Sequence, residues 1–381
     1  MQELSSKLPN VGTTIFTVMS ALANEHQAIN LSQGFPDFPS DPDLIDRVCH
    51  YMQSGFNQYA PMPGAAPLRA AIAEKIERLY PFRPNPESEI TVTAGATQAI
   101  FTAIATLVRP GDEVIVFEPA YDSYIPGIEV CGGKALPFLL KAPDYRIDWA
   151  AVEAMVTPTT RAIMINSPHN PTGTILESSD LLALQHLVKK YGLWVISDEV
   201  YEHLIYDGAA HESVLKYPEL YKRSFIAFSF GKTFHNTGWK LGYVVAPPLL
   251  TAEFRKVHQF NVFSCNTPIQ YALADYLQVP SHYEQLPGFY QAKRDFFLQA
   301  MSGSGLKPFS CRGTYFQLFD YSSLSDEPDT TFAKTLTTQY GVAAIPVSVF
   351  YSSGLDEKVI RLCFAKKTET LETAALRLQA I

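Results

Sequence analysis

Short apolar runs alternate with segments of helical periodicity between about residue 46 and residue 280. Apolar residues recur at helical spacing over residues 67–80, 97–108 and 178–191. Four other runs have the length and composition of buried strands, namely residues 113–117, 162–165, 193–196 and 225–228. Strands that alternate with helices predict a mostly parallel sheet that is covered by helices on both faces. The predicted fold class is therefore α/β.

The pattern changes in the last third of the chain. A helix is predicted over residues 286–301, shorter mixed strands and helices follow from residue 313, and an amphipathic helix covers residues 368–381. The first 45 residues are punctuated by proline and glycine and contain one short amphipathic piece, residues 16–23. We therefore expect a large domain over residues 46–285 and a smaller α+β domain over residues 286–381. Residues 1–45 are expected to form an N-terminal arm and part of the small domain.

The composition excludes several classes of protein. The chain has 381 residues, 47% of them hydrophobic and 18% charged, which is typical of a folded globular protein rather than a disordered one. Its net charge of −8 argues against nucleic-acid binding. No apolar run approaches the ~18 residues of a membrane span, and the first ten residues lack the apolar centre of a signal peptide. The five cysteines form no C-x-x-C pair, so we expect free thiols and a cytoplasmic location.

Polar clusters follow the apolar runs. They occupy residues 95–97, 166–173, 197–201 and 229–232, and the last three of them directly follow predicted strands. In open α/β sheets, ligands bind beyond the carboxyl ends of the strands. The four clusters therefore predict one shared site.

Lys232 lies in a tight polar turn between two apolar runs, residues 225–228 and 241–246. A lysine in such a turn is suited to hold an electrophile as a Schiff base, with Ser229 and Lys240 near enough to hold an anion. The spacing of Ser229 and Lys232 also matches the S-x-x-K motif of penicillin-recognising serine enzymes. The S-D-N and K-T-G motifs that those enzymes also need do not occur in this sequence.

Three other polar residues need partners. Asp198 ends a strongly apolar strand, where an unpaired carboxylate is costly, so it either meets a cation such as a protonated pyridine nitrogen or caps a loop. Arg361 lies in an otherwise apolar strand and requires an anion, either a bound carboxylate or a structural ion pair. Asn170 is held between Pro168 and Pro171 in a stiff turn that can fix its amide toward a ligand, although plain turn chemistry also explains it.

The cluster at residues 95–97 also permits two interpretations. Backbone N–H groups and the Thr97 hydroxyl at a helix N-terminus make a phosphate site. Alternatively, Thr97 simply caps its own helix.

Together these motifs resemble the fold-type-I pyridoxal-phosphate enzymes, and among them the class I/II aminotransferases. The most specific segments are Asn170-Pro171-Thr172-Gly173, Asp198-Glu199-Val200-Tyr201 and the segment around Lys232. The resemblance covers nearly the whole chain, from residues 31–34 to Arg361. It implies the two-domain α/β architecture of that fold type and pyridoxal 5′-phosphate (PLP) as the cofactor.

The resemblance also implies a role for each site residue. Lys232 is the catalytic residue, which holds the cofactor covalently and later moves the substrate proton, and Asp198 pairs with the pyridine nitrogen. Arg361 binds the substrate carboxylate. The other implied cofactor contacts are Asn170 and Tyr201 at the ring oxygen, Tyr121 stacked on the ring, Ala96, Thr97, Ser229 and Lys240 around the phosphate, and Tyr59 from a partner subunit. The other implied substrate contacts are Gly34, Asn170 and Phe16. The resemblance implies no metal.

Two departures from the family pattern narrow the expected substrate. Lys240 stands where an arginine is common, which resembles the kynurenine/glutamine-aminotransferase-like branch and, within it, the bacterial methionine aminotransferases. Between residues 256 and 292 no arginine is available to grip a second carboxylate, and the segment offers Phe260, Phe263 and Tyr271 instead. With Phe16 these aromatic side chains would favour methionine, aromatic amino acids or kynurenine over aspartate.

The expected activity is transfer of an amino group from a neutral apolar L-amino acid to a 2-oxo acid by a homodimer, since Tyr59 would act across subunits. One alternative is a PLP-dependent carbon–sulfur β-lyase, which would use the same lysine. Another is the aminotransferase-like sensor lobe of a transcription regulator. The acidic pI of about 5.6, and a sequence that begins almost directly at the substrate arm, disfavour that third interpretation.

Overall fold

The computed structural model describes residues 5–381, so the first four residues of the predicted N-terminal arm lie outside the described part. A seven-stranded sheet forms the centre of the larger part of the molecule, with strand order β2-β8-β7-β6-β5-β3-β4. Its strands are β2 (Ile90–Thr93), β3 (Glu113–Glu118), β4 (Lys134–Leu139), β5 (Thr160–Asn166), β6 (Trp194–Asp198), β7 (Ser224–Ser229) and β8 (Gly242–Val245). Only β8 runs antiparallel to its neighbours β7 and β2, so the sheet is mostly parallel as predicted.

Helices cover both faces of this sheet, because alternate side chains of each central strand enter different hydrophobic cores. Val195 of β6 belongs to one core and its neighbour Ile196 to the other. The helices α3 (Ala66–Leu79), α7 (Ser178–Tyr191) and α11 (Thr267–Tyr276) contribute to the first core. The helices α4 (Gly95–Leu107), α5 (Tyr124–Val130) and α10 (Pro248–Asn261) contribute to the second. The prediction of an α/β domain covered on both faces is confirmed.

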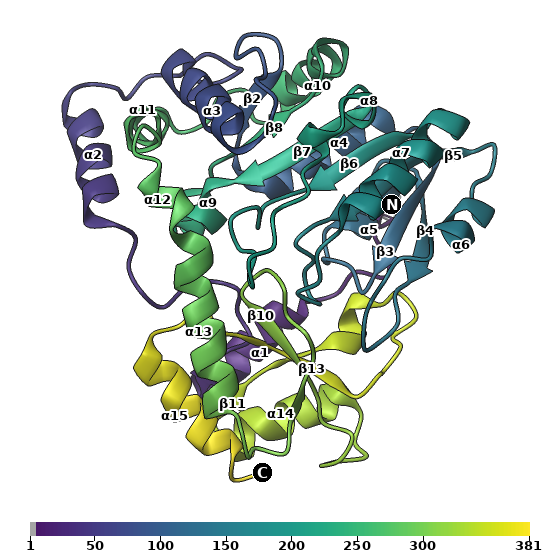
Figure 1. Ribbon diagram of the computed structural model, residues 1–381, viewed down its shortest axis with the longest axis vertical. Helices are drawn as coiled ribbons and strands as arrows, with labels where there is room; N and C mark the ends of the chain where they lie inside the picture. The colour runs from purple at the N-terminus through teal and green to yellow at the C-terminus, as the bar shows by residue number, and fades with distance from the viewer. Residues whose placement is uncertain (1–4) are drawn as a thin grey trace, which may run out of the picture.

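The remaining helices of this part are shorter or lie at its border. They are α2 (Pro42–Gln53), α6 (Trp149–Ala154), α8 (Pro218–Tyr221), α9 (Phe230–Thr233) and α12 (Ser281–Glu284). Helix α13 (Leu286–Ala300) then runs from this part of the molecule into the smaller one (Figure 1).

The smaller part is built on an antiparallel sheet of order β12-β13-β10-β9. These strands are β9 (Lys307–Pro308), β10 (Phe316–Asp320), β12 (Ile345–Pro346) and β13 (Val359–Cys363). The helices α1 (Ile15–Glu25), α14 (Asp329–Gln339) and α15 (Thr368–Leu378) lie beside this sheet in the lower half of Figure 1. Strand β1 (Ile29–Asn30) pairs in parallel with β11 (Val342–Ala343), so the N-terminal segment packs on the C-terminal third of the chain.

Within residues 5–381 no helix has both the length and the apolar character needed to cross a membrane.

Candidate functional site

A cavity of about 200 Å³ lies at the carboxyl ends of β5, β6 and β7, where the sequence predicted a shared site. It brings together nearly all of the predicted site residues: Phe16, Gly34, Ala96, Thr97, Tyr121, Asn170, Asp198, Tyr201, Ser229, Lys232, Lys240 and Arg361. They come from segments as far apart as the N-terminal helix α1 and the strand β13. Among the predicted cofactor contacts, Tyr59 is the one that does not line this cavity, and it is 82% exposed.

Lys232 extends from the short helix α9, directly after β7. Its Nζ donates to the hydroxyl of Tyr315 at 3.1 Å and to the carbonyl oxygen of Gly34 at 3.3 Å. The same atom lies over the ring of Tyr201, 5.7 Å from its centroid. Burial lowers the pKa of Lys232 to about 8, because the charged ammonium loses its hydration. At neutral pH a larger fraction of this amine is therefore neutral, and so nucleophilic, than of an ordinary lysine.

Asp198 is the last residue of β6 and is buried at the base of the cavity. The hydroxyl of Tyr124 donates to Oδ2 at 2.5 Å, and the backbone N–H of Val200 donates to Oδ1 at 3.2 Å. Burial raises the pKa of Asp198 to about 6, while these two donors and the Lys232 ammonium oppose a larger rise. A carboxylate in this setting is suited to a cationic ring nitrogen, whose charge would offset the loss of hydration.

The N-terminus of α4 opens into the cavity without a side-chain cap. Gly95 begins this helix with a φ of +77°, and a Cβ atom on it would lie 3.4 Å from Nζ of Lys240. The N-cap residue is Ala94, so the alternative in which Thr97 caps its own helix is wrong, because Thr97 lies inside the first turn. Backbone N–H groups at an uncapped helix N-terminus, with a lysine and the Ser229 hydroxyl in the same cavity, are suited to a phosphate-sized anion.

Arg361 lies on β13 and is only 1% exposed. Its Nη1 donates to Oδ1 of Asn170 at 2.7 Å, and its Nη2 donates to the carbonyl oxygen of Ser32 at 3.1 Å. Its Nε finds no hydrogen-bond partner within residues 5–381. Burial lowers the pKa of Arg361 to about 10, which leaves the guanidinium charged at neutral pH. Since both contacted oxygens are neutral, the buried cation is well suited to a carboxylate ligand.

Aromatic rings surround this guanidinium. Its carbon lies 3.8 Å from the ring centroid of Phe316, 5.4 Å from that of Phe16 and 5.3 Å from that of Phe350. The wall of the cavity beside Arg361 is therefore aromatic and apolar, as expected for Phe16 from the sequence.

The other expected aromatic residues lie elsewhere in the single chain. Phe260 is 91% exposed on α10, and Phe263 is exposed beside Tyr59, with 5.3 Å between the ring centroids. Tyr271 packs against Phe56 with centroids 4.5 Å apart. None of Phe260, Phe263 and Tyr271 lines the cavity of its own chain.

Two tyrosines of the site were not predicted. Tyr315 accepts from Lys232 and donates to the Gly34 carbonyl oxygen at 2.5 Å. Tyr124 is the hydroxyl partner of Asp198. The sequence offers a weak signal for Tyr124, which comes three residues after the predicted ring-stacking residue Tyr121. For Tyr315 the signal is its position just before β10, after Gly313-Thr314.

Comparison with known proteins agrees with this geometry. Residues 26–378 match the family model described as aminotransferase class I and II. The chain is 52% identical over 377 residues to a methionine aminotransferase of Escherichia coli, covering 99% of this chain and 98% of the relative. It is 34% identical over 408 residues to kynurenine–oxoglutarate transaminase 1 of Mus musculus, covering 98% and 96% of the two chains.

A solved structure of a methionine aminotransferase from Escherichia coli superposes with a TM-score of 0.98, at 52% identity and with 100% of both chains covered. The family match and these relatives confirm the resemblance inferred from the motifs. They also exclude the penicillin-type interpretation of Ser229 and Lys232, and both relatives are named as enzymes rather than as transcription regulators. The chain belongs to the class I and II aminotransferases.

Proposed function

We propose that the cavity binds PLP and that the protein transfers an amino group from a neutral, largely apolar L-amino acid to a 2-oxo acid. Enzymes of this family in general depend on PLP. The observation that carries the proposal is the convergence of a half-buried lysine, a buried aspartate and a buried arginine on one cavity: Lys232, Asp198 and Arg361. The methionine aminotransferase of Escherichia coli and the kynurenine transaminase of Mus musculus support this class of amino donor.

The donor set of the cavity fits PLP. The N-terminus of α4 and Lys240 would hold the phosphate, with Ala96, Thr97 and Ser229. Asp198 would pair with the ring nitrogen, while Asn170 and Tyr201 would donate to the ring oxygen and Tyr121 would stack on the ring. Lys232 would hold the cofactor covalently.

When bound, the cofactor supplies an electron sink for the electron pair that remains on the substrate Cα after deprotonation. Nζ of Lys232 would remove that proton, since its lowered pKa makes the neutral amine available near neutral pH. Tyr315 would orient Nζ by accepting its hydrogen bond. Arg361 would bind the substrate carboxylate and hold Cα within reach of Lys232, and the walls of the cavity would exclude water.

The side-chain wall supports a neutral substrate. Among the described residues that line the cavity, Arg361 is the one arginine, and Phe16 and Phe316 lie beside it. A substrate with a second carboxylate would meet aromatic carbon rather than a guanidinium, and would lose hydration without compensation.

We further propose a homodimer in which Tyr59 completes the phosphate site of the partner subunit. The exposed aromatic side chains of Tyr59 and Phe263, which lie side by side, and that of Phe260 on α10 support an interface. The domain boundaries at residues 45 and 285 remain our proposal, supported by the pairing of β1 with β11 and by the passage of α13 between the two parts. A cytoplasmic location is supported by five free cysteines within residues 5–381.

A donor-by-acceptor screen tests the proposed function. Purified protein loaded with PLP is offered L-methionine, L-phenylalanine, L-kynurenine or L-aspartate with several 2-oxo acids, and the new oxo acid is measured. Higher kcat/KM for the apolar donors than for L-aspartate is expected. A preference for L-aspartate would overturn the substrate assignment. Release of pyruvate and ammonia from a cysteine conjugate without any oxo acid would identify the β-lyase instead.

A further inference from the structure

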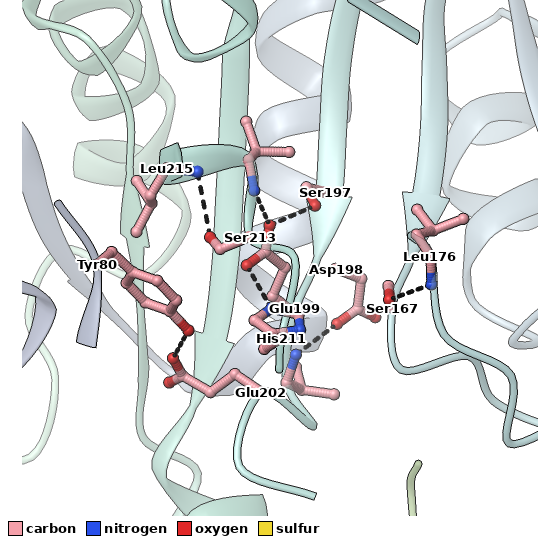
Figure 2. Close-up of polar contacts among 12 residues, drawn as sticks. Tyr80, Ser167, Leu176, Ser197, Asp198, Glu199, Glu202, His211, Ser213 and Leu215 are labelled. Atoms are coloured by element: carbon pink, nitrogen blue, oxygen red, sulfur yellow. Dashed lines mark hydrogen bonds and ion pairs between the residues drawn. The ribbon is translucent and has the colours of Figure 1, made fainter. Parts of the chain in front are cut away.

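The segment that follows β6 sends its acidic and aromatic side chains in two directions. Asp198 and Tyr201 line the cavity. Glu199 and Glu202 turn away from it into the protein interior, where they are 1% and 6% exposed (Figure 2). The proposed chemistry uses the first pair and leaves the second unexplained, and a buried carboxylate is stable only when it is paired.

Glu202 is paired with Lys75 of α3, a residue 127 positions earlier in the chain. Tyr80, the C-cap residue of α3, donates from its hydroxyl to Oε2 of Glu202 at 2.9 Å (Figure 2). Lys75 also donates to the hydroxyl of Tyr243 on β8 at 3.1 Å. Burial has the largest single effect on Glu202 and raises its pKa, but the Lys75 ammonium and its hydrogen bond, together with the neighbouring histidines, outweigh burial and lower that pKa to about 2. The pair is therefore ionised and joins α3, the turn and β8.

His203 lies beside this pair as a neutral ring. Its Nε2 is 3.4 Å from Oε1 of Glu202, but burial, reinforced by the Lys75 ammonium, lowers the pKa of His203 to about 3. The charge that balances Glu202 is therefore that of Lys75.

Glu199 is held by a second set of contacts. Its Oε1 accepts from the Ser197 hydroxyl at 2.9 Å and from the Val214 backbone N–H at 3.0 Å. Its Oε2 lies 2.9 Å from Nε2 of His211 (Figure 2). Glu199 and Glu202 thus anchor both ends of the turn that carries Asp198 and Tyr201.

We propose that Lys75 and Glu202 are positioning residues for the cofactor: their buried pair, with Glu199 anchored beside it, fixes the turn so that Asp198 and Tyr201 face the cavity. A shift of the chain by one residue would turn the glutamates toward the cofactor and leave Lys75 buried without a partner. The pair therefore selects one register of the turn. This inference rests on the proposed function, because its consequence is measured on bound PLP.

The test compares wild type with Lys75→Met, which keeps the length of the side chain and removes the charge. Three quantities are measured: the Kd of the apoprotein for PLP, the pH midpoint of the visible absorbance of the bound cofactor, and kcat/KM with L-methionine. Lys75→Met is expected to raise Kd and lower kcat/KM by about 10- to 100-fold, because small displacements of reacting groups are costly. It should also move the pH midpoint, since Asp198 and Tyr201 set the charge around the ring.

Two further variants separate positioning from stability. Tyr80→Phe keeps both charges and removes one hydrogen bond to Glu202, so it should fold and change the same quantities in the same direction by a smaller factor. Tyr221→Phe is the matched control, since it removes a 2.8 Å hydrogen bond to the carboxylate of Glu89. Tyr221 lies just before β7, at the amino ends of the parallel strands β6 and β7, whereas the turn follows the carboxyl end of β6. Tyr221→Phe should lower the stability without moving Kd or the pH midpoint.

A double-mutant cycle with Tyr201→Phe completes the test. If Lys75 acts through the turn, Lys75→Met should change Kd for PLP and kcat/KM by a smaller factor in the Tyr201→Phe background than in wild type. The two factors should differ by more than about threefold. Additive effects, or an unchanged Kd and pH midpoint in folded Lys75→Met, would overturn the proposal. If Lys75→Met does not fold, Tyr80→Phe decides by the same criteria. A wild type that neither binds PLP nor transaminates would instead refute the proposed function.

Discussion

Burial of the Asp198 carboxylate lowers the stability of the folded apoprotein at neutral pH. The pKa of Asp198 rises from 3.8 to about 6, mainly because it is buried, so the folded apoprotein binds this proton more tightly than the unfolded chain. The resulting stabilisation is present below about pH 4 and is lost as the pH rises through about 6. We therefore expect apo Asp198→Asn to gain stability relative to apo wild type between about pH 4 and pH 7, by about 3 kcal/mol.

Urea unfolding of apo wild type and apo Asp198→Asn at about pH 4 and pH 7 measures this gain in the free energy of unfolding. The same substitution should abolish tight PLP binding. A pH-independent difference in the free energy of unfolding would contradict the explanation by burial.

Tyr315 gives a second prediction for a single residue. Tyr315→Phe keeps the ring and removes the hydroxyl that accepts from Lys232 and donates to Gly34. We expect kcat to fall by about tenfold, since a positioned hydrogen bond to the reacting amine is lost. Tyr321→Phe, which removes a 2.8 Å hydrogen bond to the Glu327 carbonyl oxygen, should leave kcat unchanged. Equal steady-state rates for wild type and Tyr315→Phe would rule out this role.

Lys232, Asp198 and Arg361 could be singled out as candidates from the sequence, because a charged side chain beside or within an apolar run needs a partner, and the family resemblance then implied their roles. Tyr315 and Tyr124 could not be found in this way. Their partners lie 83 and 74 positions away in the sequence, and a tyrosine near an apolar run is as well explained by packing.

Among the elements, α4 sets the cofactor site through its first turn. Gly95→Ala and Gly208→Ala both place a side chain at positive φ, +77° and +72°, and each should cost about 1–2 kcal/mol of stability. Only at Gly95 does the added Cβ meet Lys240, because nothing lies within 4 Å of a Cβ at Gly208. Gly95→Ala should therefore also weaken PLP binding by about tenfold. Equal Kd values for the two variants in a spectral titration would contradict the phosphate site.

The central strands β5, β6 and β7 were predictable because both of their faces are buried, which requires continuous apolar runs. The edge strand β4 was not predicted, since all of its residues are exposed or half-buried and they include Pro137. Neither the strand order nor the antiparallel direction of β8 has a local sequence signal, because both depend on how the connections cross the sheet.

At the scale of the whole molecule, the pairing of β1 with β11 joins the two ends of the chain. This contact spans more than three hundred positions and could be anticipated from the sequence only as a general N-terminal arm. It brings Phe16 and Gly34 to the cavity on segments that flank β1.

The proposed homodimer makes a prediction for mixed subunits. Tyr59→Ala and Lys232→Ala should each have low activity alone. After unfolding and refolding together, hybrid dimers should regain activity, because the intact Lys232 of one subunit would lie beside the intact Tyr59 of its partner. Refolding each variant with itself is the control. If hybrids that sediment as dimers, at twice the chain mass of 42.4 kDa, regain no activity, Tyr59 does not act across subunits.

The most direct test of the whole account is to locate the covalent attachment of PLP. The protein is incubated with PLP, reduced with borohydride, digested and mapped by mass spectrometry. We predict that the pyridoxyl group lies on the peptide that contains Lys232, and that Lys232→Ala neither carries it nor transaminates. Modification of another lysine as the main product, or turnover of Lys232→Ala at the rate of wild type, would contradict the account.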